Sequence, residues 1–271
     1  MFTDVKAEFK IDEMRPGIFK IDDSGLSNAF LVVGEEKACL IDTANGLNDI
    51  GAAVRNLTDK PLIVINTHGH PDHILGNGCF EHVYLNHADW ELAKSFILQP
   101  EVDAISREHG WTFPEFTDIN EGDVFDLGGR KLAAYALPGH SDGGIMLLCP
   151  EERLLFTGDA INHHLWLHAP WNISVEECME ELEKKMFLME KADYILHGHA
   201  GDFDDISLMQ YLLDALKEIV EGKTDEDFER KGGFIEKAMC HTYKVDENKK
   251  FACYESLILY QKDNVRKNVK S

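Results

Sequence analysis

The sequence predicts an α/β protein of the α+β type, in which β-sheets pack in the middle and helices lie outside. Strand-like and helix-like segments alternate along the 271 residues, and most of the strand-like segments come in pairs around short turns. Such hairpins argue against a purely parallel, doubly wound sheet. The composition, 44% hydrophobic and 28% charged, is that of an ordinary globular protein with a sizeable core.

The first third of the chain is rich in strand signals. Residues 28–42 contain two apolar runs around GEEK, a pattern typical of a β-hairpin. Residues 43–57 begin with turn residues and continue as an amphipathic helix. Residues 61–66 form a short apolar strand that ends in a histidine-rich stretch, and 82–96 repeat the order strand, loop, helix.

Two further hairpins are predicted over 124–137 and 144–160, with turns at GGR and PEER. The clearest helix covers 173–192, where Ser174 is a good N-cap and Glu177 completes a capping box.

The remaining predicted elements are a strand at 194–202 that runs into a His/Gly turn, a helix at 205–222 ended by Gly222, and a strand at 251–261.

The chain shows no low-complexity linker and no repeat of fixed period. We therefore expect residues 1–271 to form a single domain. The stretch 94–120 is the best candidate for an insertion that acts as a lid, and a short C-terminal extension begins at about residue 222.

The charge and the cysteines limit the partners and the compartment. A formal net charge of −22 repels phosphate backbones and anionic lipid surfaces, so neither nucleic acid nor membrane is an expected partner. The six cysteines form no C-x-x-C pair and lie largely in apolar contexts, as in a reducing compartment. Neither a signal-peptide core nor an apolar run of membrane-spanning length is evident. We expect a cytoplasmic protein.

The stretch 67–73, THGHPDH, carries four metal-ligand side chains directly after a predicted strand. His68 and His70 are two residues apart, so in extended backbone they can point the same way and share one metal. The chain then turns at a proline, and Asp72 and His73 can project towards a second metal. Imidazoles with a carboxylate suit Zn²⁺, and also Fe or Mn.

Further ligand residues also follow apolar strands. His140 lies in LPGHSDGG, Asp159 in LLFTGDA, and His197 and His199 in ILHGHAGD. Loops held at strand ends by a rigid sheet are where convergent ligands belong.

The ordered set THGHPDH, PGHSDG, TGDA and HGHA, with LIDTANG around Asp42, resembles the metallo-β-lactamase fold superfamily over about residues 28–200. The resemblance implies an αββα sandwich with a dinuclear metal site at one edge. It assigns His199 rather than His197 as the last ligand, and Asp42 as a brace behind the histidine loop. The implied ligands are His68, His70 and His140 for one metal, Asp72, His73 and His199 for the other, and Asp159 as a bridge between them.

Differences between this sequence and the motifs of individual branches of the superfamily reduce the number of expected functions. True β-lactamases with this motif generally lack the bridging Asp that stands here as Asp159, and the redox-active diiron branch carries an acidic residue where His70 stands. Nucleic-acid-cleaving branches have extra domains. Small hydrolases of the glyoxalase-II and lactonase type remain, although residues 222–271 are short and partly strand-like for a glutathione-binding helical domain.

By this resemblance we expect a metallohydrolase in which a hydroxide bridging two divalent metal ions, most simply zinc, attacks a small ester-like substrate such as a thioester or a lactone. Asp72 would also take or relay a proton. The loop after Asp159 carries His163 and Trp166 and is a candidate wall of the substrate pocket.

Three alternatives stay open. They are phosphodiester hydrolysis, iron-dependent persulfide or oxygen chemistry, and a non-catalytic metal-containing binding or sensor protein. The expected partner is a small-molecule substrate, and a homo-oligomer is possible.

Overall fold

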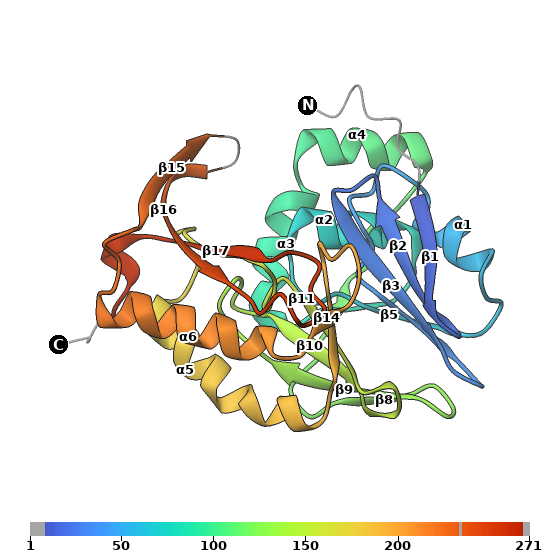
Figure 1. The fold of residues 1–271 in the computed structure, drawn as a ribbon. Helices are drawn as coiled ribbons and strands as arrows, with labels where there is room; N and C mark the ends of the chain where they lie inside the picture. Colours follow the sequence, from blue (N-terminus) through green and yellow to red (C-terminus); the bar gives the residue numbers. More distant parts are fainter. Residues whose placement is uncertain (1–8, 233–234, 268–271) are drawn as a thin grey trace.

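The computed structural model describes residues 9–232 and 235–267. Two central sheets pack face to face, and helices cover their outer faces (Figure 1). The predicted αββα sandwich is thereby confirmed.

Within the described residues, the first sheet has seven strands in sequence order. Neighbours from β1 to β4 are antiparallel, and those from β4 to β7 are parallel. The strands are β1 (Phe9–Arg15), β2 (Ile18–Asp23), β3 (Ser27–Val33), β4 (Ala38–Ile41), β5 (Leu62–Ile65), β6 (Val83–Tyr84) and β7 (Phe116–Thr117). The β3–β4 pair is the hairpin predicted over 28–42, whereas the β1–β2 hairpin was not predicted.

The second sheet has six strands within the same ranges, in the order β14-β13-β11-β10-β9-β8. They are β8 (Val124–Asp126), β9 (Lys131–Ala136), β10 (Ile145–Cys149), β11 (Leu154–Gly158), β13 (Tyr194–His197) and β14 (Asp204–Asp205). The pairs β8–β9 and β10–β11 are antiparallel, which confirms both predicted hairpins.

Alternation of side chains explains how the sheets are layered. Successive residues of a strand point to opposite faces. In β3, Phe30 joins the cluster between the sheets, where its ring centroid lies 5.5 Å from that of Phe156, while Leu31 joins the outer cluster with Ile50. In β10, Leu147 faces inward and Leu148 outward. Because both faces are covered, β3 is apolar from Ala29 to Val33 and β10 from Ile145 to Cys149.

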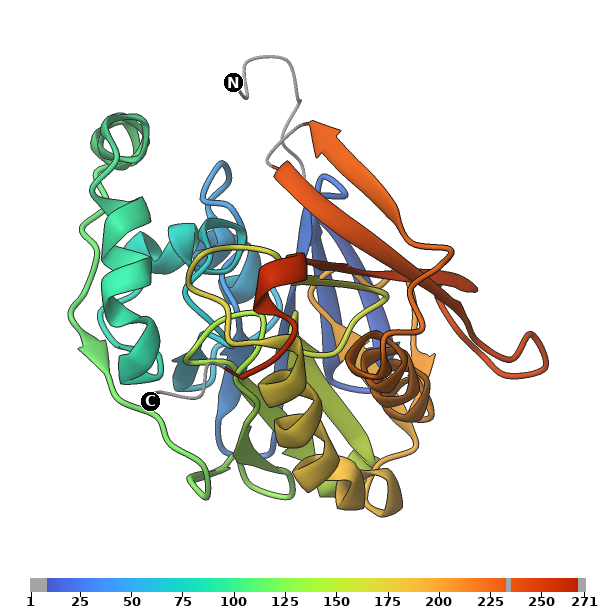
Figure 2. The same cartoon turned by 90° about the vertical axis from the view of Figure 1, so that its left-hand side faces the viewer.

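Helices cover the two outer faces (Figure 2). They are α1 (Ile50–Arg55), α2 (Pro71–Ile74), α3 (Trp90–Ile97), α4 (Pro100–His109), α5 (Val175–Lys185) and α6 (Leu208–Glu221). The predicted capping box of Ser174 and Glu177 begins α5, and Gly222, with φ 80°, ends α6. No helix of the described ranges has the length and apolar character needed to cross a bilayer.

A third, four-stranded sheet was largely missed by the sequence prediction. It has the order β12-β17-β16-β15 in the described residues, with β12 (His164–Leu167), β15 (Phe228–Gly232), β16 (Ile235–Lys244) and β17 (Glu255–Tyr260). Only β17 was predicted, within 251–261. β12 lies in the loop after Asp159 and pairs in parallel with β17, which joins the C-terminal extension to the site region.

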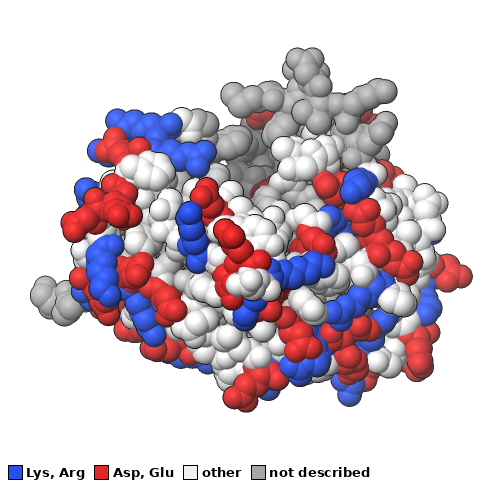
Figure 3. All heavy atoms as spheres, viewed as in Figure 1, with Lys and Arg blue, Asp and Glu red and all other residues white. Residues whose placement is uncertain are grey.

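On the face shown in Figure 3, charged side chains of both signs are mixed. Figure 3 shows acidic and basic side chains interspersed over one face, with the acidic ones in excess there as in the whole sequence, which has 49 Asp and Glu against 27 Lys and Arg.

Candidate metal centre

The end of β5 delivers the first two predicted ligands. His68 is buried, and its Nδ1 lies 3.1 Å from the Thr67 hydroxyl, which leaves Nε2 facing the interior of the site. His70 is the extended residue before α2, and its Nδ1 lies 2.8 Å from Nε2 of His140. The structure therefore brings together the histidine trio, defined as His68, His70 and His140.

Helix α2 begins with Pro71 and places Asp72 and His73 on the other side of the site. The buried His73 ring is held by Asp42, whose Oδ2 lies 2.8 Å from Nδ1. Asp42 also accepts a hydrogen bond of 2.7 Å from the backbone N–H of Thr67. It does so with φ 62°, a left-handed conformation that is uncommon for a residue with a side chain. Asp42 thus contacts both the backbone of the histidine loop and the His73 ring.

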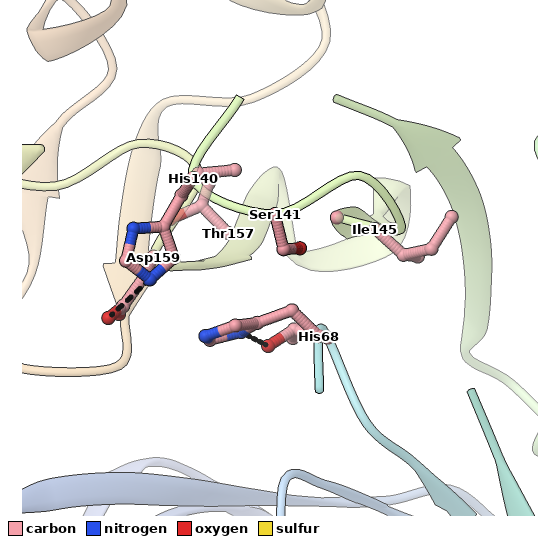
Figure 4. A pocket seen from close by; sticks show the side chains of 9 residues that line it. His68, His140, Ser141, Ile145, Thr157 and Asp159 are labelled. Carbon is pink, nitrogen blue, oxygen red and sulfur yellow. Dashed lines mark hydrogen bonds and ion pairs between the residues drawn. The ribbon is translucent and has the colours of Figure 1, made fainter. Parts of the chain in front are cut away.

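The second sheet supplies the remaining groups. Asp159 follows β11, and His199 follows β13, with its Nε2 3.0 Å from Oδ2 of Asp159. The same oxygen lies 3.7 Å from Nε2 of His140 and 3.7 Å from Nε2 of His73. Asp159 therefore lies between the two sets of histidines. Figure 4 shows its carboxylate beside the His140 ring, with the His68 ring pointing towards the same space.

Two glycines permit this close approach. A Cβ on Gly158 would lie 2.3 Å from Oγ1 of Thr67, and one on Gly198 would lie 2.5 Å from Cε1 of His73. Neither position can carry a side chain without displacing a ligand loop.

The chemistry of the donor atoms fits metal ions. Nε2 of His68, Nε2 of His73 and Oδ1 of Asp159 are buried, and within the described residues they have no hydrogen-bond partner. Buried polar atoms without partners are costly, and a bound cation would satisfy them. The potential ligand atoms lie within 4.8 Å of one another in each of three groups, which are His68/His70/His140, His68/His73/Asp159 and Asp72/His73/His199.

Electrostatics distinguish the two sides of the centre. Burial lowers the pKa of each member of the histidine trio, so these rings are neutral. Burial also acts on His73, but the carboxylates of Asp72, Asp42 and Asp159 outweigh it and raise its pKa well above the usual value. Asp159 raises the pKa of His199 to about 9.

The side chain of His197 contacts a different partner from that of His199. Its Nδ1 accepts a hydrogen bond of 3.2 Å from the backbone N–H of His199, and its Nε2 lies 3.2 Å from Oδ2 of Asp204. Asp204 is buried and also accepts from Nε2 of His163 at 3.0 Å. His197 therefore supports the loop that carries His199, and its ring faces away from the candidate ligands.

The side chains of the two residues expected in a substrate wall point away from the ligand groups, although the carbonyl oxygen of Trp166 lies 3.2 Å from Nδ1 of His140. His163 is buried, and its Nδ1 lies 2.6 Å from the Ser256 hydroxyl while Nε2 faces Asp204. The Trp166 ring packs against the small cluster formed by Ala238, Cys240 and Leu259. The structure does not bring either side chain to the ligand groups, so their substrate role stays a prediction without a supporting contact.

Asp89 is a site residue that the sequence analysis missed. It is buried, and its two carboxylate oxygens accept hydrogen bonds of 2.8 Å from Gly69 N–H and 2.7 Å from Gly143 N–H. It thereby ties the loop of His68 and His70 to the loop of His140. No local motif marks this role, because the partners are backbone groups of glycines in distant segments.

Comparison with known proteins decides the family. A sequence model of the metallo-beta-lactamase superfamily matches residues 22–199. The chain belongs to this superfamily. It is a hydrolase of that group, and the predicted resemblance is confirmed.

Individual relatives agree with this assignment. Acyl-coenzyme A thioesterase MBLAC2 of Bos taurus is 31% identical over 225 residues, which cover 69% of this chain and 79% of that protein. Atrochrysone carboxyl ACP thioesterase of Aspergillus chevalieri is 29% identical over 153 residues, covering 55% of this chain and 44% of that one. The crystal structure of DIM-1 metallo-beta-lactamase superposes with a TM-score of 0.61 at 17% identity, covering 79% of this chain and all of the other, and this likeness supports the fold alone.

Proposed function

We propose that this chain is a metal-dependent thioesterase that hydrolyses small acyl thioesters, with acyl-coenzyme A esters as the first class to test. The observation that carries the proposal is the convergence of seven His and Asp side chains at one edge of the sandwich, in a chain whose relatives include proteins named as thioesterases.

The donor set would suit two divalent ions, most simply zinc. The histidine trio would hold one, and Asp72, His73 and His199 the other, with Asp159 contributing to both. Two such ions, when bound, lower the pKa of a shared water and polarise a carbonyl oxygen.

Asp72 is the residue of this chain that we expect to accept a proton during the reaction. Oδ2 of Asp72 lies 3.5 Å from Nε2 of His73 and 3.6 Å from Nε2 of His199, and the side chain is partly exposed. A carboxylate in this position can accept the proton of the attacking water as the water oxygen bonds to the acyl carbon. The carbon–sulfur bond then breaks, and the sulfur leaves as a thiolate. Because a thiolate needs no proton on departure, this reaction requires no separate general acid.

We favour thioesters over the other substrate classes because two relatives are named as thioesterases. Their names give two different acyl carriers, coenzyme A in one and ACP in the other. Lactones, phosphodiesters and iron-dependent persulfide or oxygen chemistry are the rivals. Zinc as the metal, a cytoplasmic location and a homo-oligomer stay predictions.

A panel of acyl-coenzyme A, lactone and phosphodiester substrates tests the proposal on one sample of the full chain. We expect hydrolysis of the thioester to be fastest, to be lost with a chelator and to return with zinc. His140→Ala should lower the rate at least about a hundredfold. The matched control His87→Ala, which changes an exposed histidine paired with Asp118, should leave it unchanged. Faster hydrolysis of the lactone or the phosphodiester would contradict the thioesterase assignment.

A further inference from the structure

Two aromatic rings lie against His70, the partly exposed member of the histidine trio. The ring centroid of Phe96 lies 6.1 Å from that of His70, and the centroid of Trp171 lies 6.3 Å from it. Both rings meet the His70 ring at steep angles, as edge-to-face neighbours do. They come from segments 75 residues apart, so the fold itself assembles the pair.

Helix α3 brings Phe96 to this place. The helix begins beside Gly69, the residue between His68 and His70, where a Cβ would lie 3.3 Å from the backbone N of Ala93. Phe96 is three residues after Ala93 and therefore lies on the same side of the helix. The backbone contact that positions the ligand loop also places the Phe96 ring beside His70.

The loop that carries Trp171 is anchored to the other ligand loop. Nδ2 of Asn172 donates to the His140 carbonyl at 2.7 Å and to the Gly139 carbonyl at 3.1 Å. Its Oδ1 accepts from the backbone N–H of Ala169 at 2.7 Å. Trp171 is nevertheless 45% exposed, so a large apolar surface stays open to solvent directly beside the candidate centre. Apolar surface with a few fixed polar groups is the usual lining of a small-molecule site.

The two carboxylates among the candidate ligands, Asp72 and Asp159, pair with histidines. Among the described residues, no lysine or arginine forms an ion pair with Asp72 or Asp159. The ligand carboxylates thus bring no Lys or Arg of the described ranges to the centre that could bind a charged acyl group, whereas a hydrocarbon chain would meet the two rings.

We propose that Phe96 and Trp171 form the subsite for the acyl chain, and that this subsite selects thioesters of longer, uncharged acyl groups over acetyl. The inference rests on the proposed thioesterase function. An acyl group whose carbonyl carbon is at the ligand cluster begins beside His70, so its methylenes reach the two rings. Each methylene buried there raises kcat/KM by up to about fourfold.

A chain-length series on the zinc-loaded full chain tests the selectivity. With acetyl, hexanoyl and decanoyl thioesters, kcat/KM of the unaltered chain should rise with length. Trp171→Ala should lower kcat/KM about tenfold for decanoyl and less than about twofold for acetyl, and Trp171→Phe should retain most of the preference. The matched control Phe228→Ala removes another ring, 51% exposed on β15, and should change none of the three values.

Binding of the product acids, followed by calorimetry, gives a second readout that needs no turnover. Decanoate should bind the unaltered chain about tenfold more tightly than it binds the Trp171→Ala variant, and acetate should not distinguish them. Hydrolysis without any length preference, or a loss in Trp171→Ala that is equal for all lengths, would overturn the subsite while leaving the thioesterase standing. Decanoate binding that depends on Trp171, in a chain that hydrolyses no thioester, would support the subsite and overturn the proposed reaction.

Discussion

Asp89 shows how much of the centre depends on a residue that is not itself a candidate ligand. Its carboxylate joins the backbone of two ligand loops, and its own backbone and Cβ pack against the glycines of both. Burial raises the pKa of Asp89 above its usual value, although the hydrogen bonds from the N–H groups of Gly69 and Gly143 act in the opposite direction. Burying the Asp89 carboxyl costs desolvation free energy, and the hydrogen bonds from the two backbone N–H groups offset that cost.

Replacing Asp89 by alanine should therefore weaken both the fold and the centre. Two buried N–H groups would lose their partners, which lowers the free energy of unfolding by about 2–4 kcal/mol. The affinity of the trio for zinc should fall at least about tenfold. Urea unfolding and competition with a chelating dye measure the two effects.

Asp103→Ala provides the control. Asp103 is an exposed residue of α4 that pairs with Arg107, and its loss should cost less than about 0.5 kcal/mol. An Asp89→Ala protein as stable as this control and with undiminished zinc affinity would show that the bridge between the loops is unimportant.

At the level of elements, the two sides of the centre differ in the protons they carry before metal binds. The trio comes from the loops after β5 and β9, and burial keeps its rings neutral. His73 in α2 and His199 after β13 lie among carboxylates that raise their pKa values. A histidine must be neutral to bind a metal, so the second group must first lose protons.

Metal binding to the trio is the first step, and metal binding to the group of Asp72, His73 and His199 is the second. The second step should consequently release more protons than the first. Because the pKa of His199 is raised to about 9, its ring is protonated at neutral pH, and the affinity of the second step should fall as pH falls below that value. Calorimetric titration of the metal-free chain with zinc, in two buffers of different ionisation heat, counts the protons in each step. Equal proton release in both steps would contradict this difference.

Sequence patterns predicted the elements whose signal is local. The hairpins β3–β4, β8–β9 and β10–β11 have apolar runs on both sides of a turn, and α5 carries its own capping box. β15 was missed because all its residues are exposed and give no apolar alternation. β12 has four residues, and its partner β17 lies about 90 residues further along the chain, a pairing that no local pattern reveals.

The same distinction applies to the site. The candidate ligands stand in short motifs at strand ends, so their meeting at one place was predictable, and His199 rather than His197 is the residue that faces Asp159. That they bind metal stays a prediction. Asp89 and Asp204 act through contacts across the fold, and single acidic residues give no sequence signal of such contacts. The wall of the pocket was expected from His163 and Trp166, whereas the ring found beside the trio from that loop is Trp171.

For the whole molecule, the centre lies where the two sheets of the sandwich meet, and each sheet supplies part of it. Loops of the first sheet carry His68, His70 and the α2 residues, while loops of the second carry His140, Asp159 and His199. Bound metal would thus connect both halves of the sandwich. Whether residues 1–271 behave as one domain, and whether 94–120 act as a lid, stay predictions.

The most direct measurement is a count of metal ions per chain after purification and zinc loading, made on the unaltered protein and on His199→Ala and His140→Ala. We expect about two ions per chain in the unaltered protein and about one in each variant, since each variant disables one group of ligands. His87→Ala should keep both ions. No tightly bound metal in the unaltered chain, or a count that neither substitution changes, would contradict the assignment of these seven residues as a dinuclear centre.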